Sequence, residues 1–246
     1  MDHSLWTKKN FDSGKERLLF IMGTLEEHRF KKAILSGGIS GEPVYQLADR
    51  LCRDVDLGSD LLEFGAGQGI FARRLVEAGY QGAITCADLL PRPEGLPEKI
   101  RWFQTDLNDS ISLPDASFDS IISTEVLPAL ENPRFIFREF FRLLRPKGVL
   151  IVTNPNQESL RSWTSLILGG HFAAFRGESY PAHISAILHL DFERICAETG
   201  FAPPQFYYTD AGGLPKLPQI SWQSISFGLL RGRLFSDNMA IVTYKG

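Results

Sequence analysis

The stretch LLEFGAGQGIFARRL, residues 61–75, decides the fold of this chain. An apolar run and the acid Glu63 precede three glycines on alternate positions, Gly65, Gly67 and Gly69, and a segment with helical apolar spacing follows. Because glycine has no Cβ, a strand can turn sharply into a helix here while backbone N–H groups approach a ligand closely. The stretch predicts a strand, a binding turn and a helix, although many α/β loops carry glycines for folding alone.

Strand-like and helix-like segments alternate on both sides of this stretch, which predicts an α/β fold: a Rossmann-like, doubly wound sheet with helices on both faces. Strands are expected at 60–64, 82–87, 100–104, 117–123, 148–153 and 239–244, and helices at 25–35, 43–55, 70–78, 133–144 and 191–198. Residues 154–185 and 210–219 are rich in turn-forming residues. We expect them to be long irregular connections that cover a site.

Composition disfavours several classes of protein. The 246 residues, 43% of them hydrophobic, suffice for one substantial core. The net charge of −3 disfavours a nucleic-acid partner. A membrane-spanning helix needs a run of about 18 apolar residues, and the sequence has none, so we expect no membrane span. Cys52, Cys86 and Cys196 are far apart and have no histidine at ligand spacing. We therefore expect reduced thiols, no metal site and a cytoplasmic location.

Three acids lie near the carboxyl ends of three expected strands: Glu63 within the strand 60–64, and Asp88 and Asp106 after the next two. Because the carboxyl ends of parallel strands meet at one crevice, we expect these side chains to converge there. Asp88 is placed to accept hydrogen bonds from both hydroxyls of a ribose, and Asp106 from an exocyclic amine such as that of adenine. Each acid alone could be a helix cap or a solvated loop residue. The three together predict a nucleoside-containing ligand.

Glu63 also bears on the charge of that ligand. The nicotinamide fingerprint GxGxxG would need glycine where this chain has Ile70, and a pyrophosphate gains little from a carboxylate beside it. A cationic ligand would be stabilised by the Glu63 carboxylate. The spacing therefore disfavours a nicotinamide-dependent oxidoreductase, which stays an alternative.

The combination resembles class I S-adenosylmethionine-dependent methyltransferases of the small-molecule type. The resemblance rests on EFGAGQG at 63–69, CADLLP at 86–91, QTDLNDSISLPDASFDSIISTEVLPAL at 104–130 and REFFRLLRPKGVLIVTNPN at 138–156. It covers about residues 58–156. It implies a seven-stranded, mostly parallel sheet whose last strand is antiparallel, and MAIVTYK at 239–245 suits that strand.

The resemblance also implies how the matched residues would hold the cofactor, S-adenosylmethionine, which becomes S-adenosylhomocysteine. The loop of Gly65, Ala66, Gly67 and Gly69 would surround its methionine part, with Glu63 near the ammonium group.

The nucleoside part of the cofactor would lie against the next two segments. The resemblance implies that Asp88 holds the ribose and that Leu89 covers one face of the adenine. Asp106 and Leu107 would address the adenine edge.

Thr124 and Glu125 follow the fourth expected strand, and the resemblance places them beside the sulfonium and the acceptor. Some relatives carry a histidine shortly after this point, where this chain has Pro128 and Ala129. A catalytic base must therefore come from elsewhere, and His183 in the expected cover is our candidate, ahead of the other histidines of the C-terminal half, His171 and His189. A capping or structural role is the competing interpretation of such a histidine.

These observations predict one domain over 1–246: N-terminal helices in 1–57, a cofactor-binding core at 58–156, and acceptor-side insertions or a lid at 157–190 and 210–236. The expected activity is methyl transfer to a small-molecule acceptor, preferably at a hydroxyl group. Segments around 169–185 are similar to those of bacterial methyltransferases that act on sugars or glycoconjugates, which favours a sugar or glycan precursor. The alternative from another class is a non-catalytic module that binds the cofactor, because a fold alone does not establish activity.

Overall fold

The computed structural model describes residues 25–180 and 182–246. Within the predicted N-terminal helical segment 1–57, residues 1–24 thus lie outside the described residues. The described chain forms a seven-stranded sheet with the order β3-β2-β1-β4-β5-β9-β6 and a separate two-stranded pair, β7-β8.

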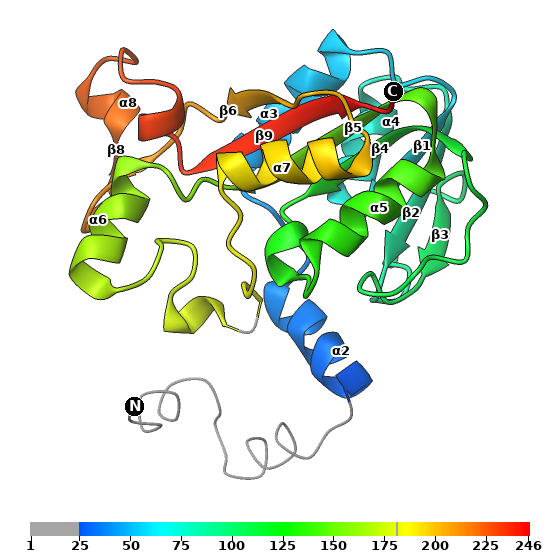
Figure 1. The fold of residues 1–246 in the computed structure, drawn as a ribbon, viewed down its shortest axis with the longest axis horizontal. Coiled ribbons are helices and arrows are strands. Elements are labelled where there is room, and N and C mark those ends of the chain that lie inside the picture. The colour runs from blue at the N-terminus through cyan, green and yellow to red at the C-terminus, as the bar shows by residue number, and fades with distance from the viewer. Residues whose placement is uncertain (1–24, 181) are drawn as a thin grey trace.

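The strands of the large sheet are β1 (Asp60–Phe64), β2 (Ala83–Asp88), β3 (Arg101–Gln104), β4 (Phe118–Thr124), β5 (Leu144–Pro155), β6 (Gln205–Tyr208) and β9 (Asn238–Tyr244). Strands β1 to β5 run parallel, whereas β9 pairs antiparallel with both β5 and β6. The last strand of the chain therefore lies inside the sheet, as the red arrow in Figure 1 shows. This confirms the predicted fold class.

Helices cover both faces of the sheet (Figure 1). On one face lie α3 (Glu42–Asp54) and α4 (Ile70–Glu77), and on the other lie α5 (Pro133–Leu143) and α7 (His189–Thr199). The helix α5 begins where the Asn132 side chain accepts the Phe135 N–H at 3.1 Å, with Pro133 in the first helical position. Each of these helices buries an apolar stripe, so the sheet is enclosed on two sides.

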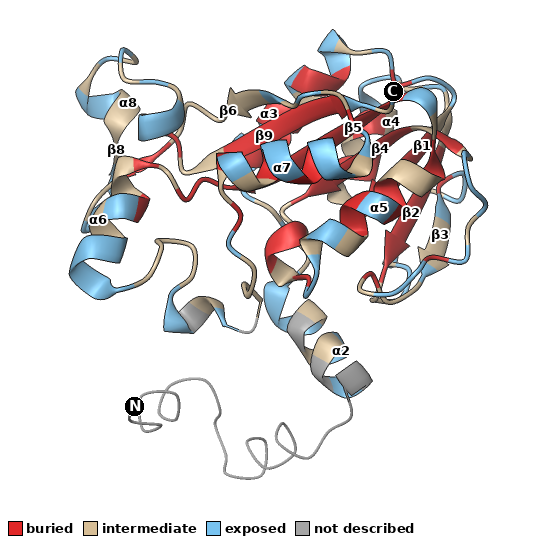
Figure 2. Cartoon of the chain, viewed as in Figure 1, coloured by how far each residue is buried: buried red, intermediate tan, exposed pale blue. Residues whose placement is uncertain are grey.

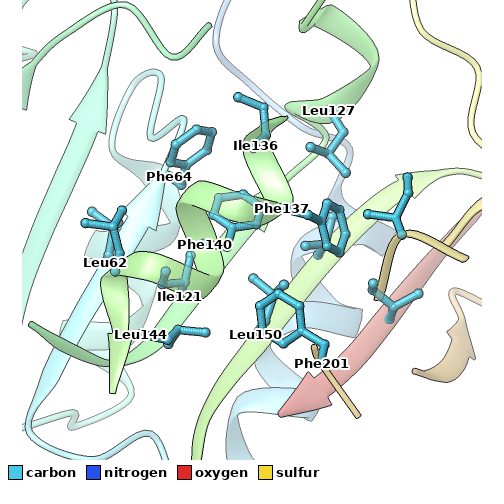
Figure 3. Close-up of a cluster of buried hydrophobic side chains, with 14 of the residues drawn as sticks. Leu62, Phe64, Ile121, Leu127, Ile136, Phe137, Phe140, Leu144, Leu150 and Phe201 are labelled. Atoms are coloured by element: carbon cyan, nitrogen blue, oxygen red, sulfur yellow. The ribbon is translucent and has the colours of Figure 1, made fainter. Parts of the chain in front are cut away.

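The core on the α5 side is built largely from phenylalanine. Figure 2 shows burial concentrated in the central strands and in the inner faces of the helices, and Figure 3 shows α5 side chains among those of the sheet. The Phe137 ring centroid lies 5.7 Å from that of Phe140 and 6.1 Å from that of Phe201. Since these side chains are almost fully buried, they fix α5 and α7 over the strands.

The connections after β5 are more regular than predicted. The helix α6 (Leu160–Gly169) interrupts the stretch 154–185 that was expected to be irregular, and β6, β7 (Gly213–Leu214), β8 (Leu217–Ser221) and α8 (Trp222–Ile225) were not predicted. Only Ser162 of α6 is buried. Its sequence therefore lacks the apolar stripe by which a core-facing helix is recognised.

The remaining described elements are the helix α2 (Leu25–Ser36) and the 3-10 helices η2 (Leu127–Ala129), η3 (Gly177–Ser179) and η4 (Arg233–Phe235). Most predicted boundaries also shift, by one or two residues except at β5. Strand β2 extends to Asp88, and β5 begins four residues before the predicted start because Leu144 already pairs with Phe118 of β4.

Candidate active site

A cavity of about 360 Å³ opens at the carboxyl ends of β1, β2 and β4. Open parallel sheets bind their ligands at this edge. The residues predicted to form the site and found in its lining are Glu63, Gly65, Ala66, Gly67, Asp88, Leu89, Asp106, Leu107, Thr124, Glu125 and His183. Gly69 is not among the lining residues. It is the N-cap of α4, in the left-handed conformation with φ of 65°.

The glycine loop passes very close to other backbone of the same chain. A Cβ on Gly65 would lie 2.2 Å from the Val126 side chain, and one on Gly67 would lie 2.3 Å from the Gly38 carbonyl oxygen. The Gly65 N–H donates to the Ala87 oxygen at 2.8 Å. Glycine is therefore needed here to pack the loop against the protein itself, and the same turn leaves one side of the loop facing the cavity.

Glu63, the penultimate residue of β1, is a buried acid, 1% exposed. Its Oε2 accepts a weak hydrogen bond from the Cys86 Sγ at 3.5 Å. Burial raises the pKa of Glu63 to about 8, and the negative charge of Asp88 adds to this, against smaller opposing effects from Cys86 and the Ala72 N–H. Such a group is poised to ionise when a cation enters the cavity.

Asp88 has two partners within the protein. Its Oδ2 accepts the Gly67 N–H at 2.7 Å, and its Oδ1 accepts the Leu90 N–H at 2.8 Å. Burial raises the pKa of Asp88 above its usual value, against the opposing effect of these N–H donors. Asp88 thus fastens the glycine loop to the end of β2, and each carboxylate oxygen keeps a second lone pair for a ligand.

Asp106 is held by a cation that sequence reasoning missed. Arg29, from α2, donates to Asp106 Oδ2 at 2.9 Å and also pairs with Asp109 and Glu131. The other oxygen of Asp106 accepts the Asn108 N–H at 2.9 Å. The Arg29 side chain is only 11% exposed, and it lines the cavity. The predicted adenine-binding acid therefore also attaches α2 to the rim of the site.

Glu125 follows β4 in a strained conformation, with φ of 60°. Its N–H donates to the Thr153 Oγ1 at 3.0 Å, and its Oε1 is buried without a hydrogen-bond partner among the described residues. Burial raises the pKa of Glu125 to about 7, against the opposing effects of the Asn238 and Thr153 side chains. A buried carboxyl oxygen without a partner is costly unless a ligand supplies one.

A second cavity, of about 220 Å³, adjoins the first. Glu125, His183 and Asn238 line both cavities. The other lining residues of the second cavity are Pro155, Asn156, Ser159, Arg161, Ala173, Ala174 and Asp237. These come from the end of β5, from α6 and its following loop, and from the chain just before β9. The predicted acceptor-side segment 157–190 therefore walls a space that continues from the first cavity, whereas 210–236 contributes no lining residue to either cavity.

The three candidate histidines are placed differently. The His183 Nδ1 lies 2.6 Å from the Ala174 carbonyl oxygen, so Nδ1 carries the hydrogen and Nε2 keeps the lone pair. His171 contacts the Ser165 side chain, and His189 lies between Glu158 and Tyr208. Of the three, only His183 is a lining residue of the two cavities.

Part of the lining was not predicted. The end of α2 contributes Ser36, the segment between α2 and α3 contributes Gly38, Ile39, Ser40 and Gly41, and β9 contributes Asn238. The glycine-rich sequence SGGISG at 36–41 was a signal for the first group. Asn238 had no local signal, because it reaches the site only through the antiparallel placement of β9.

Comparison with known proteins decides the family. The profile of the family described as "Methyltransferase domain" matches residues 31–204. The chain belongs to the S-adenosylmethionine-dependent methyltransferase family. A solved S-adenosylmethionine-dependent methyltransferase from Archaeoglobus fulgidus has the same fold, with a TM-score of 0.57 and 18% identity, over 95% of this chain and 100% of that one.

Two named relatives are similar to this methyltransferase in sequence. The malonyl-[acyl-carrier protein] O-methyltransferase of Paenibacillus sp. is 28% identical over 67% of this chain and 63% of its own length. The ubiquinone biosynthesis O-methyltransferase of Xanthomonas oryzae is 28% identical over 41% of this chain and 44% of its own. These matches, and those to two further relatives, cover 26% to 63% of each relative's length.

Proposed function

We propose that this methyltransferase transfers a methyl group from S-adenosylmethionine to a hydroxyl oxygen of a small-molecule acceptor. The observation that carries the proposal is the junction of the two cavities at Glu125, His183 and Asn238. One cavity has the acids suited to the cofactor, and the other continues from it into the acceptor-side segments. A donor and an acceptor that occupy adjoining cavities meet at this junction.

The residues of the first cavity fit the cofactor chemically. The glycine loop forms part of the wall of this cavity, and three acids with different surroundings line the same space. Glu63 would bind the ammonium group, Asp88 the ribose hydroxyls, and Asp106 the adenine amine, with Leu89 and Leu107 against the ring.

The chain's own contribution to the reaction is alignment and proton removal. S-adenosylmethionine, when bound, supplies a methyl group that its sulfonium already activates. Alignment of the acceptor at the junction supplies about 7–11 kcal/mol of barrier reduction in well-oriented systems. The His183 Nε2 would accept the hydrogen bond of the acceptor hydroxyl and take its proton, and the Glu125 Oε1 would accept a hydrogen bond from a second polar group of the acceptor.

Two observations support oxygen as the methylated atom. The two relatives described above are named O-methyltransferases, and a base with a free lone pair stands at the junction. The sequence favours a sugar or glycan precursor as the acceptor. The names of these relatives suggest another class of acceptor, the carboxyl of an acyl chain or the phenol of a quinone precursor. The three cysteines, free and buried, suit a reducing compartment such as the cytoplasm.

Methyl-labelled cofactor tests the function directly. The protein is incubated with labelled S-adenosylmethionine and a panel of sugar nucleotides, acyl thioesters and phenols. We expect label in one class of product, with loss of that label in Glu125→Gln. Binding of S-adenosylhomocysteine without any label transfer would support the non-catalytic module instead. Binding of NAD without S-adenosylhomocysteine would support the oxidoreductase.

The base is tested by a matched pair of histidine variants. Replacement of a catalytic base lowers the rate about 100-fold or more. We expect His183→Asn to lower kcat by that factor. His171→Asn, in the same segment but outside both cavities, should retain the wild-type kcat. Equal activity of the two variants would make His183 a structural residue.

A further inference from the structure

An unusual number of apolar side chains are exposed on the acceptor side of the molecule. In α6 these are Trp163, Leu166, Ile167 and Leu168, and in the segment after β7 they are Leu217, Ile220, Ile225, Phe227, Leu229 and Leu234. We call these ten residues the apolar rim. The side chains that project furthest are Phe227, 96% exposed, Leu229, 84% exposed, and Ile167, 81% exposed. Burial of such groups in the core is the usual outcome, so a concentration on one surface marks an interaction site.

The rim is one region of the structure. The helix α6 packs against η4, and α8 packs against β8, so the two segments that carry the rim are neighbours. Figure 1 shows α6, β8 and α8 together at one end of the molecule, away from β3. Figure 2 shows exposed residues over much of these elements. The rim therefore forms one end of the protein.

The distribution of charged residues indicates which kind of partner this end of the protein binds. Residues 160–177 and 211–236 contain five basic residues and no acid, so all 29 Asp and Glu residues of this net-acidic chain lie elsewhere. Of the five, Arg233 pairs with Glu158 and Arg161 with Asp237, two acids just outside these ranges, which leaves the exposed Arg176, Lys216 and Arg231 for an anionic surface. Apolar side chains flanked by lysine and arginine, with tryptophan among them, suit the interface of an anionic lipid layer.

The rim is continuous with the second cavity. Ser159, the N-cap of α6, and Arg161, in its first turn, line that cavity, whereas the later turns of α6 carry the rim. No helix of the described residues is long and apolar enough to cross a membrane. The geometry of α6 thus suits a protein that rests on a lipid surface, with its acceptor cavity close to that surface.

We propose that the apolar rim docks this methyltransferase onto an anionic membrane surface, with Phe227 and Leu229 inserted among the lipids and the flanking arginines and lysine at the headgroups. The docking itself does not depend on the proposed reaction. Its consequence rests on the proposed function: an amphiphilic acceptor could present its polar group to the second cavity while its apolar part stays in the lipid layer.

Vesicle flotation tests the docking. The full chain is mixed with vesicles of phosphatidylcholine alone or of phosphatidylcholine with phosphatidylglycerol. We expect flotation with the anionic vesicles, a decrease when salt is added, and little flotation with the neutral ones. The double variant Phe227→Ser, Leu229→Ser should lose flotation, while its melting temperature and its affinity for S-adenosylhomocysteine stay those of the wild type.

Charge variants separate the electrostatic part. Arg231→Glu and Lys216→Glu should each lower binding to anionic vesicles about fivefold or more, because a basic residue near such a surface contributes about that factor. Arg53→Glu, at an exposed position near the end of α3, is the matched control for the charge variants. Tyr244→Ser, at an exposed position at the end of β9, is the matched control for the Phe227→Ser, Leu229→Ser variant. Both controls should bind vesicles as the wild type does.

Two results would overturn the proposal. One is equal flotation of the wild type and the Phe227→Ser, Leu229→Ser variant. The other is absence of vesicle binding together with a dimer, seen by light scattering, that the same variant dissociates; this would assign the rim to a second copy of the chain. Since affinity for S-adenosylhomocysteine is measured separately, failure of the docking is distinguishable from failure of the proposed function.

Discussion

The Glu63 side chain is a buried carboxyl group in the lining of a cavity that suits a cation. Its ionisation is therefore coupled to ligand binding. With a pKa of about 8, Glu63 is mostly protonated at pH 6 in the free protein. A bound ammonium group favours the carboxylate, so binding must release a proton. Affinity should therefore rise with pH, by at most about tenfold per pH unit, until Glu63 is already ionised.

Calorimetry between pH 5.5 and 7 checks this, because the ligand amine stays protonated in that range. Titration with S-adenosylhomocysteine in two buffers of different ionisation enthalpy should reveal proton release by the wild type and less release by Glu63→Gln. Affinity that is independent of pH in the wild type would remove Glu63 from the ammonium site.

The same ionisation affects the stability of the free protein. The pKa of Glu63 in the folded state is above the ordinary value of 4.5. The protonated form therefore favours folding, and this stability is present below pH 4.5 and is lost as the pH rises through about 8. We expect the melting temperature of Glu63→Gln to fall less than that of the wild type between pH 5 and pH 8, measured without ligand.

Asp88 requires a gentler variant than alanine. Because its oxygens accept the Gly67 and Leu90 N–H groups, Asp88→Ala would release the loop as well as any ribose contact. Asparagine keeps one acceptor oxygen and removes the charge. We expect Asp88→Asn to weaken S-adenosylhomocysteine binding by about 1.5–3 kcal/mol, the value of hydrogen bonds to a charged group, and to lower the melting temperature less than Asp88→Ala does, because one of the two N–H groups keeps its acceptor. An unchanged affinity would argue against the ribose assignment.

Among the elements, α2 is attached to the site through the Arg29 side chain. Arg29 contributes the ion pairs with Asp106, Asp109 and Glu131. Arg29, Ala33 and Ser36 line the cofactor cavity, so this helix forms part of its rim. Arg29→Gln should speed both association and dissociation of S-adenosylhomocysteine, about tenfold for a loss near 1.4 kcal/mol. Hydrogen exchange of the backbone amides in residues 25–36 should be faster in the same variant.

The control for Arg29 is Arg134→Gln. Arg134 also pairs with an acid at 2.9 Å, Glu198, but both side chains are about half exposed and lie outside the cavities. Stopped-flow binding should show wild-type rates for this variant. If Arg29→Gln behaves in the same way, α2 does not limit access to the site.

The elements also show what could be read from the sequence. Strand β1 was predicted with its observed bounds because an apolar run lies between an acid and a glycine turn, and the lining acids were predicted because parallel strands end at one edge. The partner of Asp106 could not be predicted, since Arg29 is 77 residues away in sequence and an ion pair leaves no local pattern. Strand β6 was missed because its four residues depend for their pairing on β9, more than 30 residues later.

At the scale of the whole molecule, the phenylalanines are used in two opposite ways. Phe137 is fully buried and contacts Phe140, Phe192 and Phe201, so it joins α5 to α7. Phe227 is almost fully exposed on the apolar rim. One part of the apolar content therefore stabilises the fold, and another part remains available at the surface.

The same substitution at these two positions should have opposite effects. Phe137→Ala leaves a cavity in a close-packed core and should lower the free energy of unfolding by about 3–5 kcal/mol. Phe227→Ala should change it by no more than about 0.5 kcal/mol, because the side chain has few contacts to lose. Urea denaturation measures both. Vesicle flotation should reverse the order: folded Phe137→Ala should float with anionic vesicles as the wild type does, whereas Phe227→Ala should float less. A loss of stability in Phe227→Ala comparable to that in Phe137→Ala would mean that Phe227 packs within the fold, and the apolar rim would then lose its most exposed member.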